Sequence, residues 1–135
     1  MSVRPLVLIA DDDPDILELV SLTLAGDGYE VATARNGEDA LQIASERQVH
    51  LAVLDLMMPG IDGYEVTRRL READTEHSLP ILILSAFAED RQAALALAAG
   101  ADAYMRKPFS PRDLLAKAGS LILERRPRSR LAAQG

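Results

Sequence analysis

The amino-acid sequence predicts an α/β protein with a doubly wound, five-stranded parallel sheet. Two observations lead to this prediction. Short apolar runs, typical of buried strands, alternate along the chain with amphipathic segments of helical periodicity. The connections between them are short and contain turn-forming residues, which favours strand–helix–strand units in one sheet. The length of 135 residues is also that of a single domain.

The strand signals are apolar runs bounded by turn residues. Pro59-Gly60 stops the third run, and Pro80 introduces the fourth. Continuous apolar runs are the expected pattern for strands of a parallel sheet that is covered on both faces. We therefore expect strands at 6–10, 29–34, 51–55, 81–84 and 101–105.

The helix signals are apolar residues at helical spacing with recognisable ends. Pro14 suits the first turn of a helix, Gly100 suits a C-terminal cap, and Ser110-Pro111 suits a helix start. We expect helices from 14 to 26 or 28, after Asn36-Gly37, and at 63–73, 89–99 and 111–125.

Composition and charge exclude several classes of protein. The absence of cysteine removes disulfides and thiol chemistry and fits a reducing cytoplasm. No apolar run approaches the roughly 18 residues of a membrane span, so we expect a cytoplasmic protein without membrane contact. The net charge of −6 argues against nucleic-acid binding by the domain itself. We expect a domain at 1–125, followed at 126–135 by a basic tail or the start of a linker.

Polar residues follow four of the five predicted strands. Because the carboxyl ends of parallel strands lie along one edge of a sheet, where doubly wound folds bind ligands, we expect these residues to converge on one site. They are Asp11, Asp12 and Asp13 after the first strand, Asp55 at the end of the third, Ser85 after the fourth, and Lys107 with Pro108 after the fifth.

This set of residues suits phosphoryl chemistry. Asp11, Asp12 and Asp55 would repel one another, and keeping them all ionised needs a cation. Oxygen ligands without histidine or cysteine suit Mg²⁺. The metal and Lys107 would neutralise phosphoryl oxygens, and Ser85 would donate a hydrogen bond to one of them. Asp55 would then be the nucleophile that forms an aspartyl phosphate.

Simpler structural interpretations exist for these residues. An isolated aspartate after a strand is usually a loop residue or a helix cap, and Asp13 and Asp15 fit a helix start. A calcium-binding loop is rejected, because its required glycine and glutamate positions hold Ile16 and Leu22. The glycine motifs of nucleotide-binding loops do not occur in the sequence. The coincidence at several strand ends therefore carries the functional prediction.

Five short pieces of the sequence carry a further signal. They are Leu8-Ile-Ala-Asp-Asp-Asp-Pro14, Leu54-Asp-Leu-Met-Met-Pro-Gly-Ile-Asp-Gly63, Ile83-Leu-Ser-Ala86, Gly100-Ala-Asp102 and Tyr104-Met-Arg-Lys-Pro-Phe109. In this order and at these separations, they resemble the receiver domain of bacterial response regulators. The resemblance runs from about residue 6 to residue 123. It implies a flavodoxin-like (βα)5 fold with strand order 2-1-3-4-5.

The resemblance implies a role for each residue near the predicted site. Asp55 is the phosphoacceptor. Asp12 binds Mg²⁺ directly, Asp11 binds it through water, and the main-chain carbonyl of Met57 is a further ligand. Lys107 pairs with the phosphoryl group, and the bond between Lys107 and Pro108 is a candidate for the cis form.

The resemblance also implies a signalling role. A histidine kinase, directly from its phosphohistidine or through a phosphotransfer protein, would supply the phosphoryl group. The protein would catalyse only its own phosphoryl transfer and hydrolysis. Ser85 would move toward the phosphoryl group and Tyr104 would turn inward. The face formed by 89–99, 101–105 and 111–125 would then control an output domain or a downstream partner.

Two questions stay open at the level of sequence. We expect a monomer or a phosphorylation-dependent dimer. Ala103 stands where one transcription-factor subfamily has a second acid used in a charged dimer, which argues against that mode. The alternative function is a flavodoxin-like ligand-binding protein or a phosphatase-type enzyme that uses the same edge of the sheet.

Overall fold

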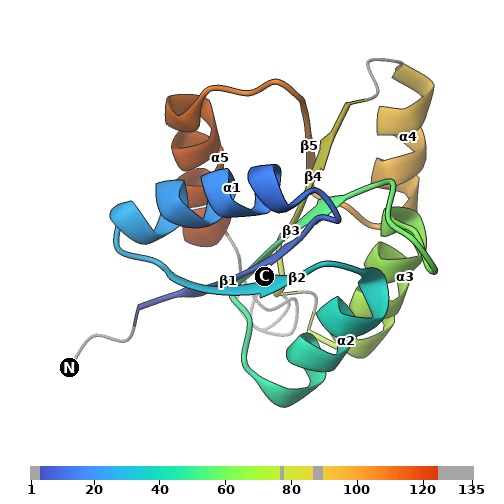
Figure 1. Cartoon of the computed structure of the whole chain (residues 1–135). Coiled ribbons are helices and arrows are strands. Elements are labelled where there is room, and N and C mark those ends of the chain that lie inside the picture. Colours follow the sequence, from blue (N-terminus) through green and yellow to red (C-terminus); the bar gives the residue numbers. More distant parts are fainter. Residues whose placement is uncertain (1–3, 77, 87–89, 125–135) are drawn as a thin grey trace.

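A computed structural model describes residues 4–76, 78–86 and 90–124. Five parallel strands form one sheet in the order β2-β1-β3-β4-β5, with helices on both of its faces (Figure 1). The predicted fold class and strand order are therefore confirmed. The strands are β1 (Leu6–Ala10), β2 (Glu30–Ala34), β3 (Leu51–Asp55), β4 (Ile81–Ser85) and β5 (Ala103–Arg106). The helices are α1 (Pro14–Gly26), α2 (Gly37–Glu46), α3 (Gly63–Ala73), α4 (Asp90–Ala99) and α5 (Pro111–Glu124).

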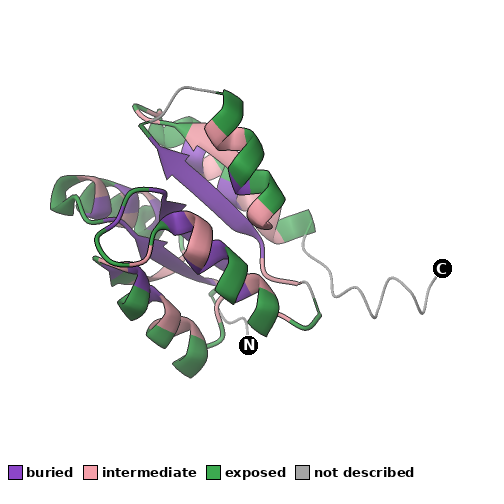
Figure 2. Ribbon diagram, turned by 90° about the vertical axis from the view of Figure 1, so that its right-hand side faces the viewer, coloured by how far each residue is buried: buried purple, intermediate pink, exposed green. Residues whose placement is uncertain are grey.

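The position of each strand in the sheet explains its composition. Every residue of β1, β3 and β4 is buried, because these strands have neighbours on both sides and helices above and below (Figure 2). The edge strands β2 and β5 are partly exposed and carry polar residues. The continuous apolar runs of the three inner strands therefore result from burial on both faces.

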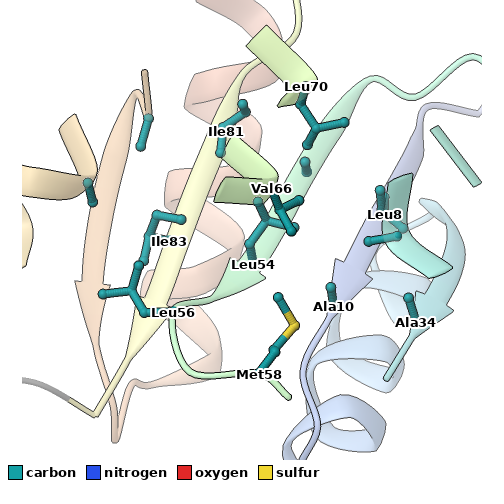
Figure 3. Close-up of a cluster of buried hydrophobic side chains, with 14 residues drawn as sticks. Leu8, Ala10, Ala34, Leu54, Leu56, Met58, Val66, Leu70, Ile81 and Ile83 are labelled. Carbon is teal, nitrogen blue, oxygen red and sulfur yellow. The ribbon is translucent and has the colours of Figure 1, made fainter. Parts of the chain in front are cut away.

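Two apolar cores fill the space between the sheet and its helices. Val7 and Ile9 of β1 face α1 and α5, whereas Leu8 and Ala10 face α2, α3 and α4. On the face covered by α2, α3 and α4, side chains of β3 and β4 pack against α3. Figure 3 shows this cluster, with Leu54 of β3, Ile83 of β4 and Val66 of α3. Truncating such a leucine to alanine typically costs about 2–5 kcal/mol. These cores hold the strand ends in fixed positions.

Side-chain caps begin the helices near the carboxyl edge of the sheet. The Asp13 carboxylate accepts a hydrogen bond from the Asp15 amide, so α1 begins at Pro14 as predicted. Asp62 caps α3 in the same way, accepting from the Glu65 amide. The Ser110 hydroxyl accepts from the Asp113 amide and caps α5. A cap of this kind contributes about 1 kcal/mol and fixes where the loop ends.

The predicted fifth strand was placed too early. The structure has β5 at Ala103–Arg106, because the residues before it close α4. Gly100 has a φ of 120°, its amide donates to the Leu97 carbonyl, and the Ala101 amide donates to the Ala96 carbonyl. This pair of bonds is a Schellman motif, in which glycine is favoured at the position with positive φ. The strand begins only after the chain has left this turn.

Smaller corrections apply to two other boundaries. The second strand begins at Glu30 and not at residue 29, because the Tyr29 amide donates back to the Leu24 carbonyl at the end of α1. The fourth strand continues through Ser85.

Residue 89 of the predicted fourth helix, residue 125 of the fifth, and the tail at 126–135 lie outside the described residues. Within the part of the chain that the structure describes, none of the helices is long and apolar enough to cross a membrane.

Gly63 is the residue whose small size most directly supports the site. It is the first residue of α3, and a Cβ atom at this position would overlap the Asp55 carbonyl oxygen and lie 2.8 Å from Leu56 Cα. Both of those neighbours are backbone atoms, which cannot move independently of the strand. We expect Gly63→Ala to destabilise the protein by about 1–3 kcal/mol, measured by urea unfolding.

Gly119 provides the matched control. It lies inside α5, where an added Cβ would meet only the Tyr29 hydroxyl at an ordinary 3.7 Å. Gly119→Ala should therefore be stabilising, by about 0.5–1 kcal/mol, because alanine is the better helix former. Equal effects of the two substitutions would contradict the assigned contact between Gly63 and the end of β3.

Candidate functional site

Three carboxylates meet at the carboxyl edge of the sheet. Asp11 directly follows β1, Asp12 is the next residue, and Asp55 is the last residue of β3. Oxygen atoms of all three lie within 4.8 Å of one another. Asp11 and Asp55 are 3% and 7% exposed, whereas Asp12 is open to solvent. The neighbouring positions of β1 and β3 in the sheet produce this cluster, which we call the carboxylate cluster.

Lys107 reaches the carboxylate cluster from the end of β5. Its Nζ atom donates to Asp11 Oδ2 at 2.7 Å and lies 3.4 Å from Asp55 Oδ1. Its amide donates to the Ser85 carbonyl at 2.8 Å, which ties the end of β5 to the end of β4. The peptide bond between Lys107 and Pro108 is cis. The ammonium group therefore stands between two buried carboxylates.

Asp11 is held by its own surroundings. Its amide donates to the Ala34 carbonyl of β2, and its Oδ1 atom accepts from the Asp13 amide at 2.9 Å. The other carboxylate oxygen faces Lys107. Asp13, which caps α1, thus also helps to orient Asp11, and this is the role that the structure gives to the third aspartate of the run.

The charges of this site shift two pKa values. Burial, together with the negative charge of Asp11, raises the pKa of Asp55 to about 6, and the nearby Lys107 only partly offsets this. Burial by itself would lower the pKa of Lys107. The hydrogen bond to Asp11 and the charges of Asp55 and Asp11 outweigh burial, and the pKa of Lys107 is raised. Lys107 therefore stays a cation at neutral pH, while Asp55 holds its proton more tightly than an ordinary aspartate.

The donor set of the carboxylate cluster fits Mg²⁺. Its ligand atoms are carboxylate oxygens from Asp11, Asp12 and Asp55, and this hard cation prefers oxygen ligands. A divalent cation would also counteract the burial and the Asp11 charge that raise the pKa of Asp55. Met57 lies two residues beyond Asp55 and is 58% exposed. Its carbonyl as a further ligand remains a prediction.

The two predicted switch residues lie on adjacent strands. Ser85 is the last residue of β4 and is 1% exposed. Tyr104 is half-buried on β5, opposite Ile83 in the strand register, and packs against the core beneath α4. Ser85 thus lies at the carboxylate edge of the sheet, whereas Tyr104 lies on the side of the sheet that α4 covers.

Comparison with known proteins supports the same family over most of the chain. Residues 7–119 match the family model described as the response regulator receiver domain. The transcriptional regulatory protein AfsQ1 of Streptomyces coelicolor is 42% identical over 118 residues, which cover 87% of this chain and 51% of that protein. The alkaline phosphatase synthesis transcriptional regulatory protein PhoP of Bacillus subtilis is 41% identical over 116 residues, covering 86% and 48%. The chain thus spans about half the length of the curated relatives it matches.

Solved structures share the whole fold. A putative response regulator from Chloroflexus aurantiacus has a TM-score of 0.86 at 35% identity, covering 90% of this chain and 100% of that one. The response regulator TrrA of Thermotoga maritima, solved in complex with Mg(2+)-BeF, has a TM-score of 0.78 at 36% identity, covering 87% and 99%. Together with the family-model match, these likenesses show that the chain belongs to the response regulator receiver domain family.

Proposed function

We propose that this protein is a phosphorylation-activated signalling switch, in which Asp55 accepts a phosphoryl group from the phosphohistidine of a histidine kinase or of a phosphotransfer protein. One observation carries the proposal: the carboxylate cluster and the Lys107 ammonium group occupy the same edge of the sheet, with Lys107 Nζ 2.7 Å from Asp11 and 3.4 Å from Asp55. Receiver-domain membership supports the same chemistry.

Asp55 acts as the nucleophile in the proposed reaction. One of its carboxylate oxygens forms a bond to phosphorus, while the phosphorus–nitrogen bond of the donor breaks and its electron pair stays on the imidazole nitrogen. Lys107 and Ser85 hold the phosphoryl oxygens. Asp11, Asp12, Asp55 and the Met57 carbonyl would hold Mg²⁺, which when bound supplies positive charge for the transferred group. In this proposal the protein turns over no separate substrate, and it catalyses only its own phosphoryl transfer and hydrolysis.

The phosphoryl group then changes a surface. It adds close to −2 charge and three acceptor oxygens at the end of β3. Ser85 moves toward it, Tyr104 turns inward, and the surface of α4, β5 and α5 changes its packing. We call this surface the switch face, and we propose that it controls an output domain or a downstream partner. The curated relatives are transcriptional regulators that extend well beyond the matched domain, which supports an output domain as the partner.

Beryllium fluoride with Mg²⁺ provides a test of the switch. One structural neighbour is the BeF3-activated receiver domain of DrrB, so this reagent activates at least one protein of the same fold. We expect amide resonances of Ser85, Tyr104 and the switch face to shift when both reagents are added to the native protein, and Asp55→Asn to show no shift. Shifts confined to the carboxylate cluster would contradict the proposed switch. Steady turnover of a phosphomonoester would instead favour the phosphatase alternative.

A further inference from the structure

Arg71, near the C-terminal end of α3, uses every hydrogen-bond donor of its guanidinium group. Nε donates to the Gly100 carbonyl at 3.1 Å, and Nη2 donates to the same carbonyl at 2.6 Å and to Asp102 Oδ2 at 2.9 Å. Nη1 donates to Asp74 Oδ2 at 3.0 Å and to the Leu79 carbonyl at 2.7 Å. Arginine has five N–H donors, so all of them have acceptors within the protein.

The acceptors come from separate parts of the chain. Asp74 follows α3 and also accepts from the Ser78 and Leu79 amides, so it organises the loop before β4. Asp102 follows α4 and also accepts from the Ile81 amide at the start of β4. Arg71 therefore joins the loop between α3 and β4 to the loop between α4 and β5. We call Arg71, Asp74, Gly100 and Asp102 the arginine clamp.

Neighbouring arginines of the same helix show how different the environment of Arg71 is. Arg68 and Arg69 are about half exposed and form ion pairs with Glu65, at N–O distances of 2.7 and 2.9 Å. The Arg71 side chain is 17% exposed. A largely buried guanidinium has a substantial desolvation cost, and it is favoured only where its donors are paired. All five donors of Arg71 have acceptors, so these hydrogen bonds hold its guanidinium group in one position.

The two ends of α4 are held unequally among the described residues. At the C-terminal end, the Schellman bonds of Gly100 and Ala101, the bond from the Asp102 amide to the Ile81 carbonyl, and the arginine clamp all act together. At the N-terminal end, the Tyr64 hydroxyl donates to the Gln92 carbonyl at a long 3.4 Å, and the exposed Arg106–Asp90 pair is 4.0 Å apart. Ala96 is the only fully buried residue of the helix.

We propose that Arg71 is a positioning residue of the switch: it fixes the C-terminal end of α4 and the start of β5, so that the response to phosphorylation is taken up at the N-terminal end of α4. This rests on the proposed function. The attachments at the C-terminal end provide the reason. Arg71 and the Schellman bonds hold that end, whereas the N-terminal end of α4 is the one that follows β4 in the chain, and phosphorylation acts near the end of β4. The fixed end also keeps the start of β5, and with it the strand that carries Tyr104 and leads to Lys107, in register.

Amide hydrogen exchange in the native protein tests the proposal without any substitution. The reporters at the fixed end are the amides of Gly100, Ala101 and Asp102, and those at the other end are the amides of Ala94 and Leu95. With beryllium fluoride and Mg²⁺, we expect the exchange rates of Ala94 and Leu95 to change severalfold more than those of the Gly100, Ala101 and Asp102 amides, which we call the clamp amides. Equal changes at both ends would overturn the proposal. No change at any amide would instead count against the proposed function.

Variants of Arg71 separate positioning from general stability. Without beryllium fluoride, Arg71→Ala should speed exchange of the Gly100, Ala101 and Asp102 amides roughly tenfold or more, relative to the β1 amide of Leu8, which reports global unfolding. Arg68→Ala is the matched control and should leave the clamp amides unchanged. Arg71→Lys should give an intermediate result, because a lysine ammonium cannot reach acceptors on both sides at once.

The activated state supplies the decisive comparison. In Arg71→Ala, beryllium fluoride with Mg²⁺ should now change exchange at the clamp amides as well, because the fixed end is lost. If Arg71→Ala accelerated Leu8 and the clamp amides by the same factor, Arg71 would be a general stabilising residue and the proposal would be wrong. If Arg71→Ala does not fold, Arg71→Lys and the native protein are compared instead. Faster exchange confined to the clamp amides in Arg71→Lys would support the proposal, and equal acceleration of Leu8 and the clamp amides would contradict it.

Discussion

Replacing Lys107 with methionine should slow phosphorylation by acetyl phosphate with Mg²⁺ about 10²–10³-fold, the usual effect of removing one group that stabilises a developing negative charge. The Lys107 ammonium lies 2.7 Å from Asp11 and 3.4 Å from Asp55, and is the nearest cation that the structure shows at the carboxylate cluster. Methionine keeps the apolar stem of the side chain but not its charge. The rate constant follows from intact mass spectra taken over time.

A second effect of this substitution is a change in the pH profile. Lys107 opposes the burial and the Asp11 charge that raise the pKa of Asp55 to about 6. Without Lys107, this pKa should rise further, so phosphorylation of the variant should require higher pH than that of the native protein. Lys117, an exposed residue of α5, is the control, and Lys117→Met should retain the native rate. A Lys107→Met rate within about threefold of native would contradict the role given to Lys107.

Asp55→Asn should stabilise the metal-free protein at neutral and alkaline pH. The pKa of Asp55 is raised from 3.8 to about 6 in the folded state, first by burial and then by Asp11. Below about pH 4 the carboxyl group is protonated in both states, but between about pH 4 and 6 the unfolded chain loses this proton first. The folded native protein therefore loses stability relative to the variant as pH rises through this range.

The expected size of this effect is large for a single side chain. The stability gap between Asp55→Asn and the native protein should widen by about 2–3 kcal/mol from pH 4 to pH 8, measured by urea unfolding in a metal chelator. Adding Mg²⁺ at pH 8 should narrow the gap, since a cation favours the ionised native carboxylate. A gap that stayed constant between pH 4 and pH 8 would show that Asp55 is not destabilised by its surroundings.

Much of the fold was accessible from the sequence because the inner strands are buried on both faces. The runs that became β1, β3 and β4 are almost entirely apolar, and turn residues such as Pro59 and Pro80 mark their limits. Parallel pairing then places their carboxyl ends at one edge, so the convergence of Asp11, Asp12 and Asp55 follows from topology alone. The predicted cluster is accordingly found in the structure.

Features that depend on contacts between residues distant in the sequence were harder to predict. The start of β5 was misplaced because bonds from Gly100 and Ala101 back into α4 decide where the strand can begin. Likewise, the sequence brings Lys107 to the site but does not indicate that its shortest contact in the structure is with Asp11. Both outcomes depend on geometry that only tertiary packing provides.

The role of Arg71 was missed, although a signal existed. Three arginines lie close together in α3, and composition does not distinguish them. Helical periodicity does, because Arg71 follows the buried Thr67 by four residues and lies on the inner side of the helix, unlike Arg68 and Arg69. A charged residue on the buried side of a helix predicts a polar partner, and the partners proved to be Gly100, Asp74 and Asp102.

The central claim is that Asp55 is the phosphoacceptor, and the mass of the intact protein tests it most directly. The native protein and Asp55→Asn would each be incubated with acetyl phosphate, with and without Mg²⁺. We predict a single added phosphate on the native protein that requires Mg²⁺, and no addition to the variant. An addition that persisted in Asp55→Asn, or no addition to the native protein, would contradict the claim.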